Sequence, residues 1–111
     1  MSPAAEAAPV AFVLEAGAGG ALTARGPLTF ATARAARLAG LAVMAAAPSQ
    51  PALVMDCAGI EAADSAGLAV LLDWLATAKA SGHALRYVRL PQDFAALARI
   101  SEVESLLERG V

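Results

Sequence analysis

The alternation of apolar and polar positions predicts a β-hairpin near the start of the chain. "VAFVLEA" (10–16) is compatible with a first strand, and "ALTARG" (21–26) alternates apolar with polar side chains as a second strand does. "GAGG" (17–20) between them is typical of a turn. Residues 1–9 are rich in Ala and Pro and have no periodicity, so we expect a disordered lead before a domain that spans 10–111.

The middle of the chain predicts a helix and then a short strand. Thr29 is a candidate N-cap for an alanine-rich helix that runs to about Ala46, and Pro48 and Pro51 would end it. "ALVMDC" (52–57) is an almost continuous apolar run bounded by helix and strand breakers. Such a run is typical of a central strand that is covered on both faces.

The second half of the chain continues this alternation of helices and strands. A helix is predicted over 64–81, with Gly82 suited to the left-handed position after its end. "ALRYVRL" (84–90) alternates as a strand does, "PQDFAALARIS" (91–101) predicts a third helix that opens at its proline, and "EVESLLERG" (102–110) predicts a shorter terminal one. The order of elements predicts a small α/β fold with a single layer of mixed β-sheet packed against helices.

Polar side chains stand at the start of the helix predicted over 64–81. Asp64 precedes the first apolar position, so its carboxylate can accept hydrogen bonds from the first free amides as an N-cap. Ser65 falls at the first helical position, where an attached phosphate would meet backbone donors but also the repelling carboxylate of Asp64. Gly67 costs about 1 kcal/mol relative to alanine inside a helix. That cost indicates the close approach of another backbone, from a neighbouring strand or from a partner protein.

A helical projection at about 100° per residue separates two faces of the same helix. One face is a core stripe made of Leu68, Leu71, Leu72 and Leu75. The opposite face carries Val70, Asp73, Trp74 and Thr77. Because aromatic anchors with polar neighbours are enriched at protein interfaces, this face is predicted to bind a partner. The alternative is that Trp74 packs against the adjacent helix within the monomer, and weak homodimerisation through the Trp74 face is left open.

Composition narrows the class of protein. Hydrophobic residues make up 59% of the chain but aromatic ones only 5%, since alanine supplies much of the apolar count. The net charge is −2 and the basic residues are scattered, which argues against a nucleic acid partner. Cys57 is the only cysteine, so no intrachain disulfide or cysteine-based zinc site is expected, and its thiol is interpreted as a small buried apolar group.

Neither membrane insertion nor secretion is expected. The longest uncharged run, 38–55, is interrupted by "PSQP" and does not read as a bilayer span. The first residues lack the basic region of a secretory signal. A cytoplasmic location is the default expectation.

The chain offers few groups for catalysis. His83 is the only histidine and follows a helix-ending glycine, where a solvated turn residue is expected rather than a general base. Ser65 has no candidate base nearby in sequence and lacks the G-x-S-x-G pattern of a hydrolase nucleophile. "GAGG" (17–20) is followed by no Lys-Ser or Lys-Thr pair, so it is not a phosphate-binding loop. We therefore expect no enzyme, no metal and no cofactor.

The run "LVMDCAGIEAADSAGLAVLLDWLATAKASGHALRYVRLPQDFAALARISEVESLL" (53–107) resembles a STAS domain, the module named after sulphate transporters and anti-sigma factor antagonists. Its most specific element is "DSAGL" (64–68), which follows the buried strand with Asp56 at its end. In the antagonist branch, the hydroxyl residue directly after the aspartate is the phosphorylation site, and Ser65 occupies that place. The resemblance implies a partner contact at Asp64, Ser65, Ala66 and Gly67.

Within the family, "DSAGLAVLLDWLATAKASG" and "LPQDFAALARISEVESLL" are most similar to MlaB, the small cytoplasmic STAS subunit of Mla-type phospholipid-transporting ABC complexes, which act in outer-membrane lipid asymmetry. This similarity implies docking against an MlaF-like ATPase subunit and a peripheral place at the inner membrane through that partner. The alternative is an anti-sigma factor antagonist regulated by phosphorylation at Ser65. Ala66 favours the transporter subunit, because the antagonist branch often has Ser or Thr there. Such a subunit needs no catalytic group, since binding that favours one ATPase state is enough.

Overall fold

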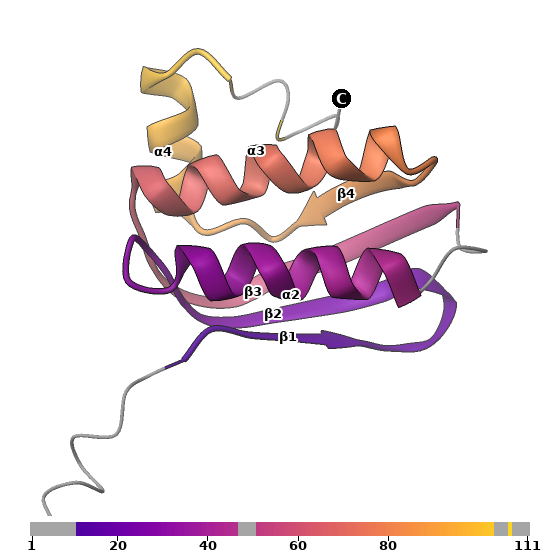
Figure 1. The fold of residues 1–111 in the computed structure, drawn as a ribbon. Helices are drawn as coiled ribbons and strands as arrows, with labels where there is room; N and C mark the ends of the chain where they lie inside the picture. The colour runs from indigo at the N-terminus through magenta and orange to yellow at the C-terminus, as the bar shows by residue number, and fades with distance from the viewer. Residues whose placement is uncertain (1–10, 47–50, 104–106, 108–111) are drawn as a thin grey trace, which may run out of the picture.

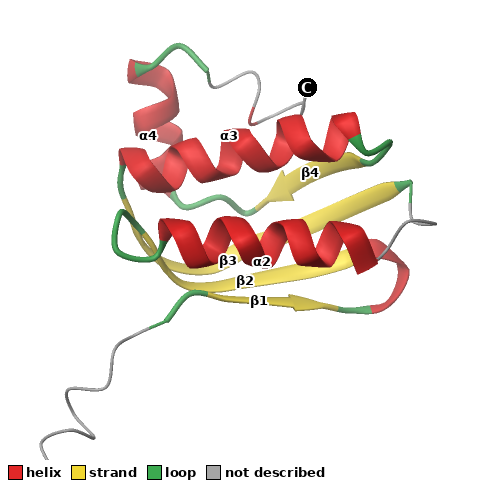
Figure 2. Ribbon diagram, viewed as in Figure 1, coloured by secondary structure: helices red, strands yellow, loops and turns green. Residues whose placement is uncertain are grey.

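The computed structural model describes residues 11–46, 51–103 and 107, and their elements follow the predicted order. The elements are β1 (Val13–Ala16), a 3-10 turn η1 (Ala18–Gly20), β2 (Ala21–Leu28), α2 (Ala33–Ala46), β3 (Ala52–Ala63), α3 (Ser65–Ala80), β4 (Ala84–Val88) and α4 (Gln92–Ile100). Figures 1 and 2 show the strands as one layer with helices packed against it. The predicted disordered lead, 1–9, and most of the predicted terminal helix, 102–110, lie outside the described residues.

The strands form a mixed sheet in the order β1-β2-β3-β4. β1 and β2 are antiparallel, which confirms the predicted hairpin, whereas β2–β3 and β3–β4 are parallel pairs. Each parallel pair is joined by a helix, and both of these helices, α2 and α3, lie on the same face of the sheet (Figure 1). Right-handed crossovers that progress in one direction along a sheet place their helices on one face.

The prediction that the central strand is covered on both faces is wrong. β3 is central, since it pairs with β2 and with β4. Its side chains alternate between buried and exposed: Met55 is buried, while Val54 is 39% exposed. The far face carries mostly alanine, valine and charged side chains and has no described element over it. The continuous apolar run therefore correctly indicated a central strand, but it did not indicate that both faces of that strand are buried.

Several element boundaries differ from the predicted ones, and two of these differences have a clear cause. α2 begins at Ala33, because 29–32 form a separate turn in which the Thr32 N–H donates to the Thr29 carbonyl at 3.0 Å. β3 continues to Ala63, six residues beyond the predicted end, because β2 offers backbone pairing as far as Leu28. Weak local strand propensity is overridden by a neighbouring strand in the correct register.

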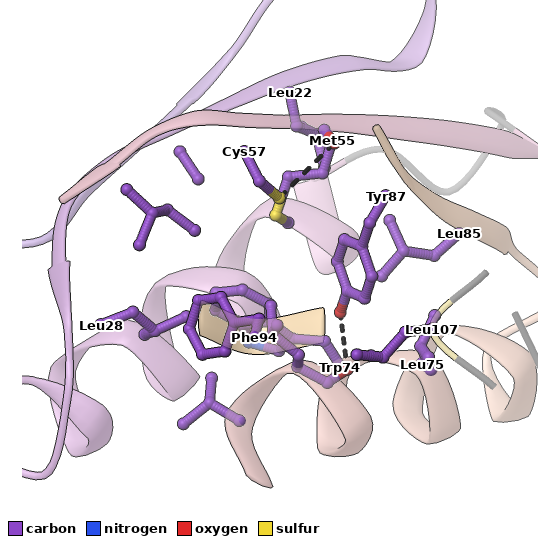
Figure 3. Packing of buried hydrophobic residues seen from close by; sticks show 14 of the residues in the cluster. Leu22, Leu28, Met55, Cys57, Trp74, Leu75, Leu85, Tyr87, Phe94 and Leu107 are labelled. Carbon is purple, nitrogen blue, oxygen red and sulfur yellow. Dashed lines mark hydrogen bonds between the residues drawn. The ribbon is translucent and has the colours of Figure 1, made fainter. Parts of the chain in front are cut away.

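The core lies between the sheet and the helices, and its largest fully buried side chains include Trp74 and Phe94 (Figure 3). The Tyr87 hydroxyl donates to the Leu71 carbonyl at 2.6 Å, which satisfies the polar end of a buried ring. Cys57 is buried as predicted, and desolvation raises the pKa of its thiol to about 12. His83 is 6% exposed, so the prediction of a solvated turn residue is wrong.

None of the described helices is long and apolar enough to cross a membrane. Within the same residues, no three His, Cys, Asp or Glu side chains gather where they could hold a metal ion.

Candidate functional site

Three helices begin at one end of the domain. β2, β3 and β4 are parallel and each leads into a helix, so the starts of α2, α3 and α4 gather beyond the carboxyl ends of these strands. The first turn of α3 lies between the first turn of α2 and α4 (Figure 1). In open α/β sheets this edge is where functional residues are usually presented. The "DSAGL" stretch (64–68) is located there.

Asp64 connects the start of α3 to the turn before α2. One carboxylate oxygen, Oδ1, accepts the Gly67 N–H at 3.0 Å, which confirms the predicted N-cap. The other, Oδ2, accepts the Phe30 N–H at 2.9 Å. The Phe30 and Gly67 amides, in that order, hold the pKa of Asp64 below its usual range. One ionised side chain therefore fixes two backbone segments that are 34 residues apart in the chain.

Phe30 is an exposed residue at this site that the sequence did not predict. Its side chain is 84% exposed, although its backbone is held by Asp64. The sequence pattern predicted a helix that begins directly after Thr29, so Phe30 was expected within its first turn. The available signal was the threonine at each end of this segment, since Thr32 Oγ1 accepts the Thr29 N–H at 3.0 Å and closes the turn.

The residues of the motif have different surroundings. Ser65 is exposed and Ala66 is half-buried, so both present surface at the start of α3. Gly67 is buried, and a Cβ atom there would collide with the Leu28 carbonyl oxygen. The close approach that the glycine indicated is therefore that of the neighbouring strand β2. Gly67 has no side chain and is buried, so it offers little surface to a partner.

The predicted partner-binding face of α3 is wrong at its two largest apolar members. Val70 is 5% exposed and Trp74 is 0% exposed. The Trp74 indole Nε1 donates to the Arg37 carbonyl at 3.3 Å, and its ring lies against Gly40, where a Cβ atom would collide with it. The Phe12 ring centroid is 5.9 Å from that of Trp74. The alternative interpretation, that Trp74 packs against the adjacent helix within the monomer, is therefore correct. Because the ring is buried, it is not available for self-association.

The helical projection failed because α3 is covered on more than one side. Three leucines of the stripe, Leu68, Leu71 and Leu75, are buried in the core, whereas Leu72 is half-buried at its edge. α2 runs beside α3 and covers the flank that carries Trp74. Asp73 and Thr77 remain half-buried at the boundary of this contact. The Arg37 Nε donates to an Asp73 carboxylate oxygen at 2.8 Å, so Asp73 holds the two helices together at the surface.

Two surface grooves border the start of α3, each of about 500 Å³. The groove between α2 and α3 is lined by Ala33, Arg34, Arg37, Ala66, Ala69, Val70 and Asp73. The groove between α3 and α4 is lined by Ala63, Asp64, Ser65, Asp93, Ala96 and Leu97. Alanine supplies three lining residues of the first groove and two of the second, so a partner backbone could approach closely at these points.

Among the described residues, no histidine lies near the Ser65 hydroxyl, and no hydrogen bond joins it to the carboxylates of Asp64 and Asp93, which line the same groove. The single histidine, His83, lies beyond the far end of α3, a helix of 16 residues and therefore roughly 24 Å long. Both oxygens of the adjacent Asp64 carboxylate already accept backbone amides. The start of α3 is therefore a grooved surface that carries charged side chains.

Comparisons with known proteins agree with this fold. A family model described as "Mlab, STAS domain" matches residues 12–108. A solved structure of the murine Solute Carrier 26 family member A9 (Slc26a9) anion transporter, in the inward-facing state, superposes with a TM-score of 0.56 at 19% identity. That match covers 78% of this chain and 14% of the transporter chain, and at this identity it shows a shared fold alone. No curated protein matches significantly. With a family match over most of its length, the chain belongs to the MlaB-type STAS domain family.

Proposed function

We propose that this chain is a non-catalytic STAS subunit that binds and supports the cytoplasmic ATPase of an Mla-type phospholipid-transporting ABC complex. The contact is a docking surface at the start of α3, formed by Phe30, Arg34, Ser65, Ala66 and Ala69. This proposal places the chain in the cytoplasm, peripheral to the inner membrane through its partner. Membership of the MlaB-type family and the shape of this surface support it.

The observation that carries the proposal is the exposure of Phe30. A phenylalanine that is 84% exposed carries an unfavourable apolar area, and covering such a side chain contributes about 1.5–3 kcal/mol. Phe30 is also held in place, because its N–H is bonded to Asp64 beside Ser65. An aromatic side chain with two rotatable bonds on a fixed backbone loses little conformational entropy on binding, which suits an interface anchor.

Ser65 lies beside this anchor and gives the surface its sensitivity to charge. Its exposed side chain stands next to the ionised Asp64 at the first turn of α3. A glutamate or aspartate at position 65 would add a second negative charge that has to be desolvated when the partner packs against it. We therefore expect Ser65→Glu and Ser65→Asp to weaken the complex, and Ser65→Ala to leave it nearly unchanged.

Affinity capture tests the proposal. The tagged chain is used as bait in its own cells, and co-eluting proteins are identified by mass spectrometry; we expect an ABC transporter ATPase. Phe30→Ala should lower the affinity for the purified ATPase by about 30-fold, the equivalent of roughly 2 kcal/mol. Ile100→Ala is the matched control, since Ile100 is 81% exposed at the end of α4 and lies outside the docking surface. Equal binding by Phe30→Ala and the wild type would refute the assignment of the surface.

The second candidate is an anti-sigma factor antagonist regulated by phosphorylation at Ser65. The exposure of Ser65 favours it, because a kinase needs access to the hydroxyl. The same capture experiment separates the two functions: an antagonist would retain an anti-sigma factor kinase in place of the ATPase. Incubation of that complex with ATP should then add a phosphate to Ser65 and release the partner.

A further inference from the structure

The docking surface lies between two grooves of opposite charge. The groove on the α2 side is lined by Arg34 and Arg37 with a single carboxylate, Asp73. The groove on the α4 side is lined by Asp64 and Asp93 and by no cationic side chain. A line from α2 to α4 across Ser65 therefore runs from positive to negative surface.

Not all of these charges are available to a partner. The Arg37 guanidinium is bonded to Asp73 at 2.8 Å, and this pair neutralises itself. Asp64 keeps its negative charge but uses both oxygens on the Phe30 and Gly67 amides. Arg34 and Asp93 are both exposed, and neither forms an ion pair within the described residues. Arg34 and Asp93 are therefore the two outward charges of the surface.

The position of Arg34 adds an independent indication. Arg34 is the second residue of α2, and the first turn of this helix holds no acidic residue. The positive end of the helix dipole disfavours a cation there. Within the described residues, neither the helix dipole nor an ion pair compensates the charge of Arg34, and an acidic side chain of a partner could do so. Asp93 lies in the first turn of α4, where an anion is favoured by the same dipole.

We propose that the docking surface recognises a polarised segment of the ATPase, with an acidic side chain facing Arg34, an apolar side chain against Phe30 and a basic side chain facing Asp93. This inference rests on the proposed function, since it names the partner chemistry at the same surface. Opposite charges at the two ends set the direction in which a segment lies across the site. A segment of the same composition in reverse orientation would place like charges together.

Charge-reversal variants test the polarity. Arg34→Glu makes the chain more negative and Asp93→Lys makes it more positive, and each should weaken binding of the purified ATPase by roughly five- to tenfold at low salt. The double variant restores the net charge of the wild type and should bind more weakly than either single variant. Arg86→Glu and Glu15→Lys are controls with the same charge changes on the far face of the sheet, and they should bind normally.

The outcomes distinguish a polarised segment from a partner surface of uniform charge. A uniformly acidic partner surface would be weakened by Arg34→Glu and strengthened by Asp93→Lys, and a uniformly basic one would respond in the opposite way; either result overturns the inference. Insensitivity of both variants to charge and to salt also overturns it. The identity of the captured protein tests the proposed function separately, since the charge response can be measured on any partner that binds stoichiometrically. Capture of no protein at all would overturn both.

Discussion

Asp64 is the most informative residue to replace, because its carboxylate stabilises both the start of α3 and the turn before α2. Replacement of an N-cap residue by alanine costs about 1 kcal/mol. The second bond, from the Phe30 N–H, goes to a charged acceptor, for which about 1.5 kcal/mol is the low end of the usual range. We use the low end because this bond is exposed to solvent. Asp64→Ala should therefore lower the free energy of unfolding by roughly 2–3 kcal/mol.

Urea unfolding followed by tryptophan fluorescence measures this change. Trp74 is the only tryptophan and is fully buried, so its emission reports on the core. Asp64→Asn keeps one good acceptor for the cap and should cost only about 1 kcal/mol. Asp93→Asn is the matched control: it removes an exposed acid from the first turn of α4, and it should cost less than about 1 kcal/mol.

Two results would refute this reasoning. The first is an Asp64→Ala protein whose stability lies within about 0.5 kcal/mol of the wild type, the usual range for surface substitutions. The second is an equal loss in Asp64→Asn and Asp64→Ala, which would mean that the acceptor oxygen retained by asparagine contributes nothing to the cap. The link to function is tested in a double-mutant cycle with Phe30→Ala. If Asp64 positions Phe30 for the ATPase, the effects of the two substitutions on binding are not additive.

Two further predictions concern the core, and a third concerns the titration of two carboxylates at the surface. Gly40→Ala should be destabilising by about 1–3 kcal/mol in urea, although alanine is the better helix former, because the new methyl group collides with the Trp74 indole. Trp74→Ala should lower the free energy of unfolding by about 3–5 kcal/mol and broaden the amide NMR spectrum. Wild-type stability in this variant would contradict the burial of Trp74. Asp56, next to the Arg89 guanidinium, and Asp64 both have a pKa below the usual value of 3.8. The stabilisation by these two carboxylates is present above that value and is lost as the pH falls through their lowered pKa values. The melting temperature should therefore decrease when the pH is lowered below about 4. This decrease should be smaller in Asp64→Asn.

Local sequence patterns predicted the order of the elements and the start of α3. The hairpin followed from alternation, the cap from an aspartate before an apolar helix, and the end of α3 from Gly82, whose φ is 82°. Gly67 was recognised as a point of close approach, although its neighbour could not be named. Each of these features depends on a residue and its neighbours within about one helical turn, so the chain alone carries the information.

Errors arose where distant segments meet. The projection of α3 identified the leucine face but placed Trp74 outside, since a projection contains no second helix. Gly40 of α2 leaves room for the indole ring, and this contact joins positions 34 residues apart along the chain. Likewise, the length of β3 depended on how far β2 continues beside it.

The candidate site shows the same division. By itself, the sequence determined that Asp64 and Ser65 stand at the exposed start of a helix, because capping and helical phase are local properties. Only the tertiary structure decided that Phe30 is held beside Ser65, that Val70 and Trp74 are buried, and that Arg34 and Asp93 border the surface with opposite charge. These outcomes depend on how α2 and α4 pack around α3, and packing is decided by contacts between segments that local sequence patterns do not record.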